Sequence, residues 1–123
     1  MERQSKKYDL VLEALRAAEG PLSANELWAA CQPVAIGIAT IYRALKRGEE
    51  AGELHRVEMP GGAPRYEPTD RGHHHHFLCS SCNKAFDLEG CVADLERLLP
   101  PQFSLTGHEI VLYGSCSTCR EVA

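Results

Sequence analysis

The chain has 123 residues and a formal net charge of −4 at pH 7, a length that allows one or two small domains and excludes a large enzyme fold. Its 44% hydrophobic and 24% charged residues are ordinary for a soluble globular protein. No apolar run approaches the roughly 20 residues of a membrane span, and the first residues lack the apolar core of a signal peptide, so we expect a cytosolic protein with no membrane partner. Residues 1–69 carry a net −1 and residues 70–123 a net −3, so the first half can still present a basic face.

The first half of the sequence predicts three helices. Apolar residues recur at helical spacing over residues 8–18, and Ser23 and Glu26 form the S-x-x-E capping box that opens a second helix. A third helix is expected over residues 38–51, although Gly48 weakens it by about 1 kcal/mol relative to alanine.

A β-hairpin is expected after the third helix, with two short strands around a turn at Gly61 and Gly62. Three helices and a hairpin make a winged helix–turn–helix, whose third helix enters the DNA major groove. The stretch TDRG, residues 69–72, is a candidate hinge. It divides the chain into a DNA-binding domain over residues 1–69 and a metal-binding domain over residues 70–123.

The second domain is predicted to be small and mixed. Two strands are expected on either side of the C-x-x-C motif at Cys79 and Cys82, the first cysteine knuckle. A last strand leads into the C-x-x-C motif at Cys116 and Cys119, the second knuckle. A short helix is predicted over residues 92–99, because its apolar residues share one face: Val92, Leu95, Leu98 and Leu99. The fold class is therefore α+β, a winged helix–turn–helix followed by a small C-terminal α/β domain.

Two C-x-x-C pairs predict a structural zinc site. In a reducing compartment, paired cysteines are more often metal ligands than disulfides, and two residues between thiolates let both sulfurs reach one tetrahedral zinc at about 2.3 Å. The alternative, a thioredoxin-like dithiol, needs a βαβ pattern that the sequence lacks. Four thiolates leave no open position, so the site is structural; its ligands are Cys79, Cys82, Cys116 and Cys119.

The other two cysteines are read differently. Cys31 lies on the apolar face of the second helix and is expected to be a buried residue that only packs in the core. Cys91 precedes the predicted short helix, close to the metal region, and three roles stay open for it: an ordinary thiol, a further metal ligand, or a redox-sensitive thiol.

Four consecutive histidines feed directly into the first knuckle. On a strand, successive side chains point to opposite faces, so His73 and His75 face one way and His74 and His76 the other. Two open metal sites are therefore predicted, and the alternative is a solvated polar edge strand. Imidazole and carboxylate suit zinc and also iron, manganese or nickel. Further ligands are available from the hairpin, the short helix and the segment before the last strand: His55, Glu67, Asp94, Glu96 and His108.

The third helix carries the candidate DNA contacts. Tyr42 can contact a thymine methyl group, and Arg43 a phosphate or a guanine. The alternative for each basic residue is a solvated surface charge. The β-hairpin that follows this helix forms the wing. The predicted DNA-binding residues on the helix and the wing are Thr40, Tyr42, Arg43, Lys46, Arg47 and Arg56, with Lys6 and Lys7 as further phosphate contacts.

Four stretches occur in a fixed order: "SANELW", "IGIATIYRALKRGEEAGELHRVE", "GHHHHFLCSSC" and "LYGSCSTC". Together they resemble the ferric uptake regulator family of metal-dependent bacterial repressors. The resemblance implies a winged-helix domain on double-stranded operator DNA, a C-terminal domain that forms a homodimer, and metal sites that set the angle between the two. No nucleophile–base pairing stands out in the sequence, so we do not expect an enzyme.

Within the family, the sequence is most similar to zinc uptake regulators, which implies zinc as both structural and regulatory metal. His55 falls where zinc-sensing members place a sensor ligand, and Pro21 stands where the iron-sensing branch has a histidine. The resemblance implies a sensor site of His55, Glu67, His74 and His76, in which Glu67 replaces the cysteine of many zinc sensors. It implies an additional site of His73, His75, Asp94 and His108, with Glu96 able to replace Asp94.

Three alternatives remain. The first is a sensor of iron, manganese, nickel or peroxide within the same family, and the second is a zinc-binding adaptor that does not bind DNA. The third is a zinc hydrolase or deaminase. The deaminase pattern requires a proline directly before a C-x-x-C pair, and neither pair in this sequence has one, so this alternative is disfavoured. No small-molecule substrate is expected.

Overall fold

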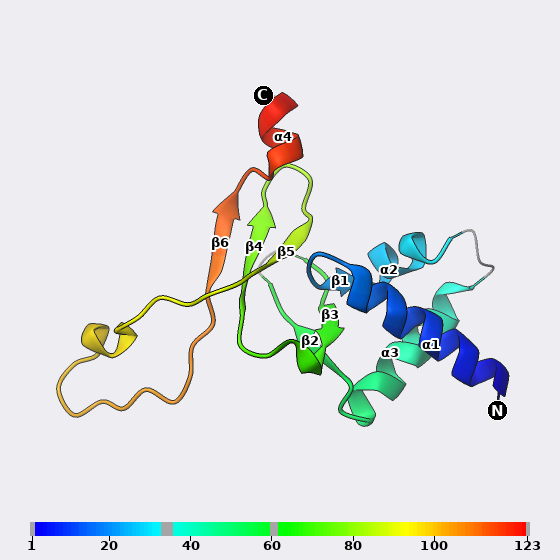
Figure 1. Cartoon of the computed structure of the whole chain (residues 1–123), viewed down its shortest axis with the longest axis horizontal. Coiled ribbons are helices and arrows are strands. Elements are labelled where there is room, and N and C mark those ends of the chain that lie inside the picture. Colours follow the sequence, from blue (N-terminus) through cyan, green and yellow to red (C-terminus); the bar gives the residue numbers. More distant parts are fainter. Residues whose placement is uncertain (1, 33–35, 60–61, 123) are drawn as a thin grey trace. The chain divides into compact units, whose positions relative to one another are not determined.

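The computed structural model describes residues 2–32, 36–59 and 62–122 (Figure 1). The chain divides into two compact units, Met1–Gly72 and His73–Ala123. The fold is α+β, as predicted: a helical region with a small sheet comes first, and a unit with a mixed sheet follows. Within the described ranges, no helix has the length and apolar character needed to cross a bilayer.

The first unit contains three helices and a three-stranded sheet. The helices are α1 (Glu2–Ala17), α2 (Ala24–Ala30) and α3 (Ile38–Glu50). The strands β1 (Leu22–Ser23), β2 (Leu54–Val57) and β3 (Arg65–Pro68) pair antiparallel in the order β1-β3-β2. The predicted helices and hairpin strands are confirmed, whereas Gly61 of the predicted turn lies outside the described residues. Strand β1 was not predicted, because two residues are too few to form an alternating pattern.

The capping box forms and also joins two elements. The Ser23 hydroxyl accepts from the Glu26 backbone N–H at 3.2 Å, and the Ser23 N–H donates to Glu26 Oε1 at 2.9 Å. The same carboxylate oxygen accepts from Nη1 of the buried Arg65 at 2.7 Å. The signal that starts α2 therefore also fixes this helix against β3.

The hydrophobic core of the first unit lies between the helices and the small sheet. Its buried residues extend along the chain from Tyr8 to Tyr66 and include Cys31, as predicted. Gly48 of α3 belongs to this packing: a Cβ at that position would overlap Cδ1 of Leu54 on β2. The glycine that weakens the helix in isolation thus lets α3 approach the wing closely.

A 3-10 turn, η1 (Thr69–Arg71), ends the first unit at the predicted hinge. The Arg71 guanidinium donates to the Leu15 carbonyl at 2.6 Å, and to the carbonyls of Arg16 and Ala18. These carbonyls lie at the C-terminal end of α1, where backbone acceptors have no partner within the helix. Gly72 follows with φ of 72°, in the left-handed region that glycine adopts at little cost.

The second unit is a three-stranded mixed sheet with one short helix. Strands β4 (His75–Cys79), β5 (Ala85–Leu88) and β6 (Val111–Gly114) lie in the order β5-β4-β6, with β4–β5 antiparallel and β4–β6 parallel. A long crossover joins β5 to β6. Helix α4 (Ser117–Val122), which was not predicted, begins inside the second knuckle.

The helix predicted over residues 92–99 is wrong. The structure has one 3-10 turn there, η2 (Leu95–Leu98). An amphipathic helix gains its stability mainly by packing its apolar face. Here Val92 is 61% exposed and Leu98 80%, so within the described chain nothing covers that face.

Candidate metal centres and nucleic-acid surface

The four knuckle cysteines converge at the end of the second unit's sheet. Cys79 ends β4, Cys82 follows in the knuckle, and Cys116 and Cys119 lie before and inside α4. One Sγ from each lies within 4.8 Å of all the others, and the Cys82 and Cys116 sulfurs are 3.9 Å apart. Zinc–sulfur bonds of about 2.3 Å at tetrahedral angles separate two sulfurs by about 3.8 Å. The sulfurs therefore have the spacing of a closed four-thiolate zinc site.

The backbone around the first knuckle favours a thiolate. The N–H groups of Cys82 and Cys116 each donate to Cys79 Sγ at 3.4 Å, and these bonds lower the pKa of Cys79 to about 6. A thiolate is the form of cysteine that binds metal. Asn83 follows with φ of 64°, a left-handed conformation that asparagine tolerates better than most residues other than glycine.

A second group combines three histidines with Cys91. Nε2 of His73, His75 and His108 lies 3.4, 3.2 and 3.0 Å from Cys91 Sγ. The structure does not bring the predicted ligands Asp94 and Glu96 to this group. Asp94 instead precedes the η2 turn, with its backbone in the left-handed region at φ of 62°. Cys91, for which the sequence left a ligand role open, takes the fourth position.

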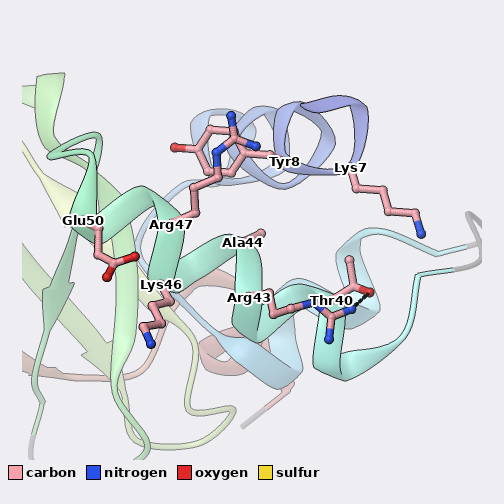
Figure 2. Close-up of a pocket in the computed structure, with 8 residues that line it drawn as sticks. All are labelled: Lys7, Tyr8, Thr40, Arg43, Ala44, Lys46, Arg47 and Glu50. Carbon is pink, nitrogen blue, oxygen red and sulfur yellow. Dashed lines mark hydrogen bonds between the residues drawn. The ribbon is translucent and has the colours of Figure 1, made fainter. Parts of the chain in front are cut away.

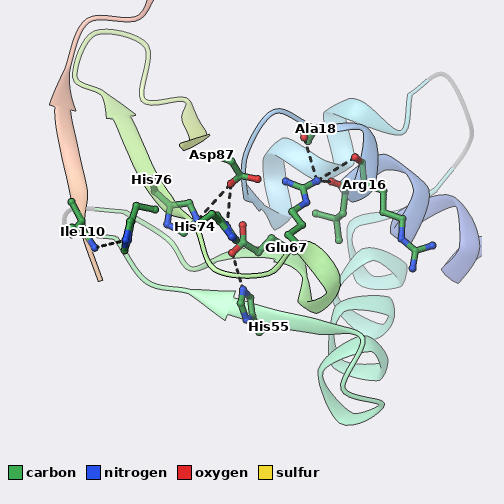
Figure 3. Close-up of polar contacts among 11 residues, drawn as sticks. Arg16, Ala18, His55, Glu67, His74, His76, Asp87 and Ile110 are labelled. Carbon is green, nitrogen blue, oxygen red and sulfur yellow. Dashed lines mark hydrogen bonds and ion pairs between the residues drawn. The ribbon is translucent and has the colours of Figure 1, made fainter. Parts of the chain in front are cut away.

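His75 is the buried member of this group. Burial lowers the pKa of His75 below its usual value of 6.5, and the nearby rings of His73 and His108 lower it further. The ring is therefore neutral at pH 7 and offers a lone pair. The Ile110 N–H donates to its Nδ1 at 3.3 Å (Figure 3). Ligation through Nε2 places a proton on Nδ1, so this bond is lost when a metal binds.

The predicted sensor residues fall into two sets, one in each unit. In the first unit, His55 on β2 and Glu67 on β3 are directly paired across the sheet, with His55 Nε2 2.7 Å from Glu67 Oε1. In the second unit, the rings of His74 and His76 lie 4.8 Å apart. Both sets are drawn in Figure 3. The four histidines thus alternate in pairs as predicted, although only His75 and His76 belong to β4.

Asp87 is a ligand candidate that the sequence reasoning missed. Its Oδ1 lies 3.5 Å from His74 Nε2 and 3.6 Å from His76 Nε2 (Figure 3). Asp87 on β5 pairs directly with His76 on β4. Treating the first knuckle as the turn of a β4–β5 hairpin and counting outward from it would have placed Asp87 beside the histidines.

A basic groove of about 510 Å³ lies between α1 and α3 (Figure 2). The predicted Thr40, Arg43, Lys46 and Arg47 line it, together with Lys7 of α1. Arg43 Nη2 donates to Thr40 Oγ1 at 2.9 Å, and the Arg47 guanidinium lies 4.3 Å from the Tyr8 ring centroid. These contacts hold two guanidinium groups in fixed positions on the α3 side of the unit.

Two other predicted DNA contacts lie outside the groove lining. Tyr42 is 55% exposed on α3. Arg56 on β2 donates to Glu49 Oε1 at 3.3 Å and lies 5.6 Å from the Tyr66 ring centroid. A phosphate contact by Arg56 therefore competes with its ion pair to Glu49.

The ferric uptake regulator family matches residues 3–113 of the sequence. The chain belongs to this family. Its members are transcription regulators, not enzymes, and they bind operator DNA and dimerise.

Curated relatives carry the name ferric uptake regulation protein. That of Campylobacter upsaliensis is 36% identical over 88 residues, which are 69% of this chain and 56% of that protein. That of Bordetella parapertussis is 35% identical over 107 residues, or 81% of this chain and 76% of that protein. The chain thus spans little more than half the length of the first of these relatives.

Solved structures of the same fold come from regulators named for different metals. A zinc-bound manganese uptake regulator has a TM-score of 0.74 at 26% identity, over 89% of this chain and 87% of its own. The Vibrio cholerae ferric uptake regulator has a TM-score of 0.70 at 28% identity, over 89% and 88%. FurB of M. tuberculosis, a zinc uptake regulator, has a TM-score of 0.54 at 26% identity, over 96% and 95%.

Proposed function

We propose that the protein is a zinc-responsive transcriptional regulator that binds double-stranded operator DNA as a homodimer and controls zinc homeostasis genes. The observation that carries the proposal is the pairing of a basic groove on a winged helix with convergent groups of metal-ligating side chains in the second unit. The first part supplies DNA affinity, and the second makes that affinity depend on a metal.

The four-cysteine group is proposed to hold structural zinc. Among the described residues of the second unit, only His75, Leu78, Cys79 and Ala85 are buried. So small a core supplies little folding free energy, and a metal site that exists only in the folded chain adds its binding energy to folding. Zinc at this site would therefore be retained under conditions that empty the other sites.

The regulatory site is proposed to take His55 and Glu67 from the first unit and His74 and His76 from the second, with Asp87 as a further ligand. The two units are joined through the η1 turn and Gly72. A metal shifts a conformational equilibrium only by its differential affinity for the two states. Ligands drawn from both sides of a hinge meet this requirement, because only one arrangement of the units presents all of them together.

DNA binding is proposed to use α3 and the wing. The residues assigned to it are Thr40, Tyr42, Arg43, Lys46, Arg47 and Arg56. Tyr42 offers an exposed ring for a thymine methyl group, and the basic groove offers charge for the backbone. Lys7 joins the set, because it lines the same groove.

The homodimer is proposed to form through the second unit. Large apolar side chains are exposed on its crossover and on β6: Val92, Leu98, Phe103, Leu105, Leu112 and Tyr113. Exposed apolar side chains in such number on so small a unit favour a protein–protein interface. A symmetric dimer then presents two winged helices to the two half-sites of a palindromic operator.

Zinc is preferred as the regulatory metal over iron or manganese. The likeness to a zinc uptake regulator supports it, as do His55 at the position of a zinc-sensor ligand and Pro21 at the position of the iron-type histidine. Iron is the second candidate, because the curated relatives are named for it and carboxylate oxygens such as those of Asp87 also suit iron and manganese.

Metal content and operator binding on one preparation test the proposal. A mild chelator removes weakly held metal, retained zinc is counted, and zinc, manganese and ferrous iron are then titrated without oxygen against a palindromic operator fragment by fluorescence anisotropy. We expect one retained zinc per chain and recovery of DNA binding at the lowest free concentration with zinc. His55→Ala should abolish the response, whereas Glu89→Gln, a carboxylate of the second unit outside every ligand group, should keep it.

Two other results would redirect the assignment. Recovery with iron or manganese at free concentrations where zinc fails would keep the regulator and overturn the metal. Absence of metal-dependent DNA binding would favour the zinc-binding adaptor.

A further inference from the structure

We propose that Cys91 is a thiolate ligand of a second zinc site, completed by His73, His75 and His108, and that a metal in this site fastens the crossover between β5 and β6 to β4. The inference goes beyond the proposed function, because it gives Cys91 a role and does not depend on DNA binding.

The geometry carries the inference. Three Nε2 atoms surround one sulfur at 3.0, 3.2 and 3.4 Å. Zinc–sulfur bonds of about 2.3 Å and zinc–nitrogen bonds of about 2.0–2.1 Å at tetrahedral angles separate sulfur from nitrogen by about 3.5 Å. A small outward shift of the four atoms therefore makes room for an ion at their centre.

Hydrogen bonds to sulfur gain little in this arrangement. A thiol is a weak donor and a weak acceptor, so gathering three ring nitrogens around Cys91 Sγ contributes little stability as hydrogen bonds alone. The three rings also lie close to one another: the centroid of His73 is 4.7 Å from that of His75 and 5.0 Å from that of His108. A cation bound by the thiolate and by the Nε2 lone pairs of three neutral rings would use all four atoms at once, at the cost of the Ile110 N–H bond to Nδ1 of His75.

The donor set decides which metals fit. Thiolate is a soft ligand that selects zinc and copper(I), whereas carboxylate suits manganese and magnesium. Three imidazoles and one thiolate also fill all four tetrahedral positions, as in structural rather than catalytic zinc sites. Cys91 in place of the predicted Asp94 or Glu96 thus makes the site selective for zinc over manganese.

The positions of the ligands define what the metal would do. Cys91 and His108 lie at the two ends of the crossover, and residues 92–107 between them are almost entirely solvent-exposed. His75 begins β4, the middle strand of the sheet, and His73 lies two residues before it. One ion would therefore close the exposed segment into a loop and fix both of its ends to the central strand.

Cobalt substitution tests the inference on the full chain. Protein that keeps its tightly held zinc after mild chelation is titrated with Co²⁺ without oxygen, and the sulfur-to-cobalt charge-transfer absorption in the near ultraviolet is recorded. We expect this absorption in the wild type and its loss in Cys91→Ser. Cys31→Ser is the matched control, because Cys31 lies in the core of the first unit and outside every ligand group. Zinc is counted again at the end, so that exchange at the four-cysteine site is measured.

Affinity and selectivity give a second readout. Cys91→Ser should weaken zinc binding at this site by at least about 100-fold, because loss of a group that only supports a ligand already costs about 10–100-fold and Cys91 is proposed as a ligand itself. Cys91→Asp should keep a metal but bind manganese better relative to zinc than the wild type does. Three results would overturn the inference: cobalt binding without the absorption in the wild type, equal absorption in Cys91→Ser, or no cobalt bound beyond the four-cysteine site. None involves DNA, so a failure of the proposed function is seen separately.

Discussion

Replacing Gly48 with alanine has two effects of opposite sign on the stability of the first unit. Alanine is the better helix former by about 1 kcal/mol, so Gly48→Ala stabilises α3 if nothing else changes. The new Cβ, however, would lie 2.6 Å from Leu54 Cγ and 3.2 Å from Leu54 Cβ, and it would overlap Leu54 Cδ1. Leu54 is 2% exposed, so its side chain cannot turn into solvent. Overpacking of this kind costs about 1–3 kcal/mol, and the net effect is a loss of about 1 kcal/mol.

Urea unfolding of the zinc-loaded protein measures this balance. Ala39→Gly, at an exposed position of the same helix, calibrates the propensity effect with no packing change. Leu54→Ala relieves the overlap, so the double variant should show a favourable coupling of about 1–2 kcal/mol relative to the two single changes. A gain in stability from Gly48→Ala alone would refute the proposed close approach of α3 to the wing.

Two further predictions concern the basic groove and the buried histidine. Arg43→Ala should reduce the salt dependence of operator binding. The slope of log K against log salt should become shallower by about 0.9 for each phosphate that is no longer neutralised, or about 1.8 for a dimer. The control Lys84→Ala, in the second unit, should leave the slope unchanged. Because the folded-state pKa of His75 is lowered, its contribution to stability is present above pH 6.5 and is lost as the pH falls through the folded pKa. Urea midpoints between pH 8 and pH 5, on protein that keeps its structural zinc, should fall on acidification and fall less in His75→Asn; equal slopes in the two proteins would contradict the assignment.

The sequence was most informative where local and tertiary signals agree. The capping box starting at Ser23 predicts the start of α2, and the alternation of residues 73–76 predicts which histidines pair. The two C-x-x-C motifs predict a four-cysteine group that the chain then brings together from 34 residues apart. The spacing within each motif fixes its local geometry, and for the cysteines the pairing of β4 with β6 brings the two motifs together.

The misses occur where distant segments decide the structure. The apolar spacing of residues 92–99 is that of a helix, but no surface of the described chain covers it, and propensity alone does not hold so short a helix. Asp87 could have been found by counting the β4–β5 register outward from the knuckle, whereas Cys91 depends on the path of the crossover. That path is not set by neighbouring residues, so spacing alone could not choose Cys91 over Asp94.

The two proposals meet at the crossover. Its segment between Cys91 and His108 carries exposed Val92, Leu98 and Phe103, the side chains assigned to the dimer. Forming that interface from an open segment costs the entropy of ordering it, whereas a metal that joins two positions 17 residues apart removes part of that entropy in advance. A cross-link over a loop of this length is worth about 3 kcal/mol per chain by the chain-entropy relation for closed loops, or about 6 kcal/mol for the two chains of a dimer. That is an upper bound of roughly 2 × 10⁴-fold on the gain in dimer affinity, since each 1.4 kcal/mol is tenfold. Dimerisation should therefore depend on zinc through Cys91 even where DNA is absent. A Cys91→Ser dimer as tight as the wild type at saturating zinc would show that dimerisation does not use the metal site at Cys91.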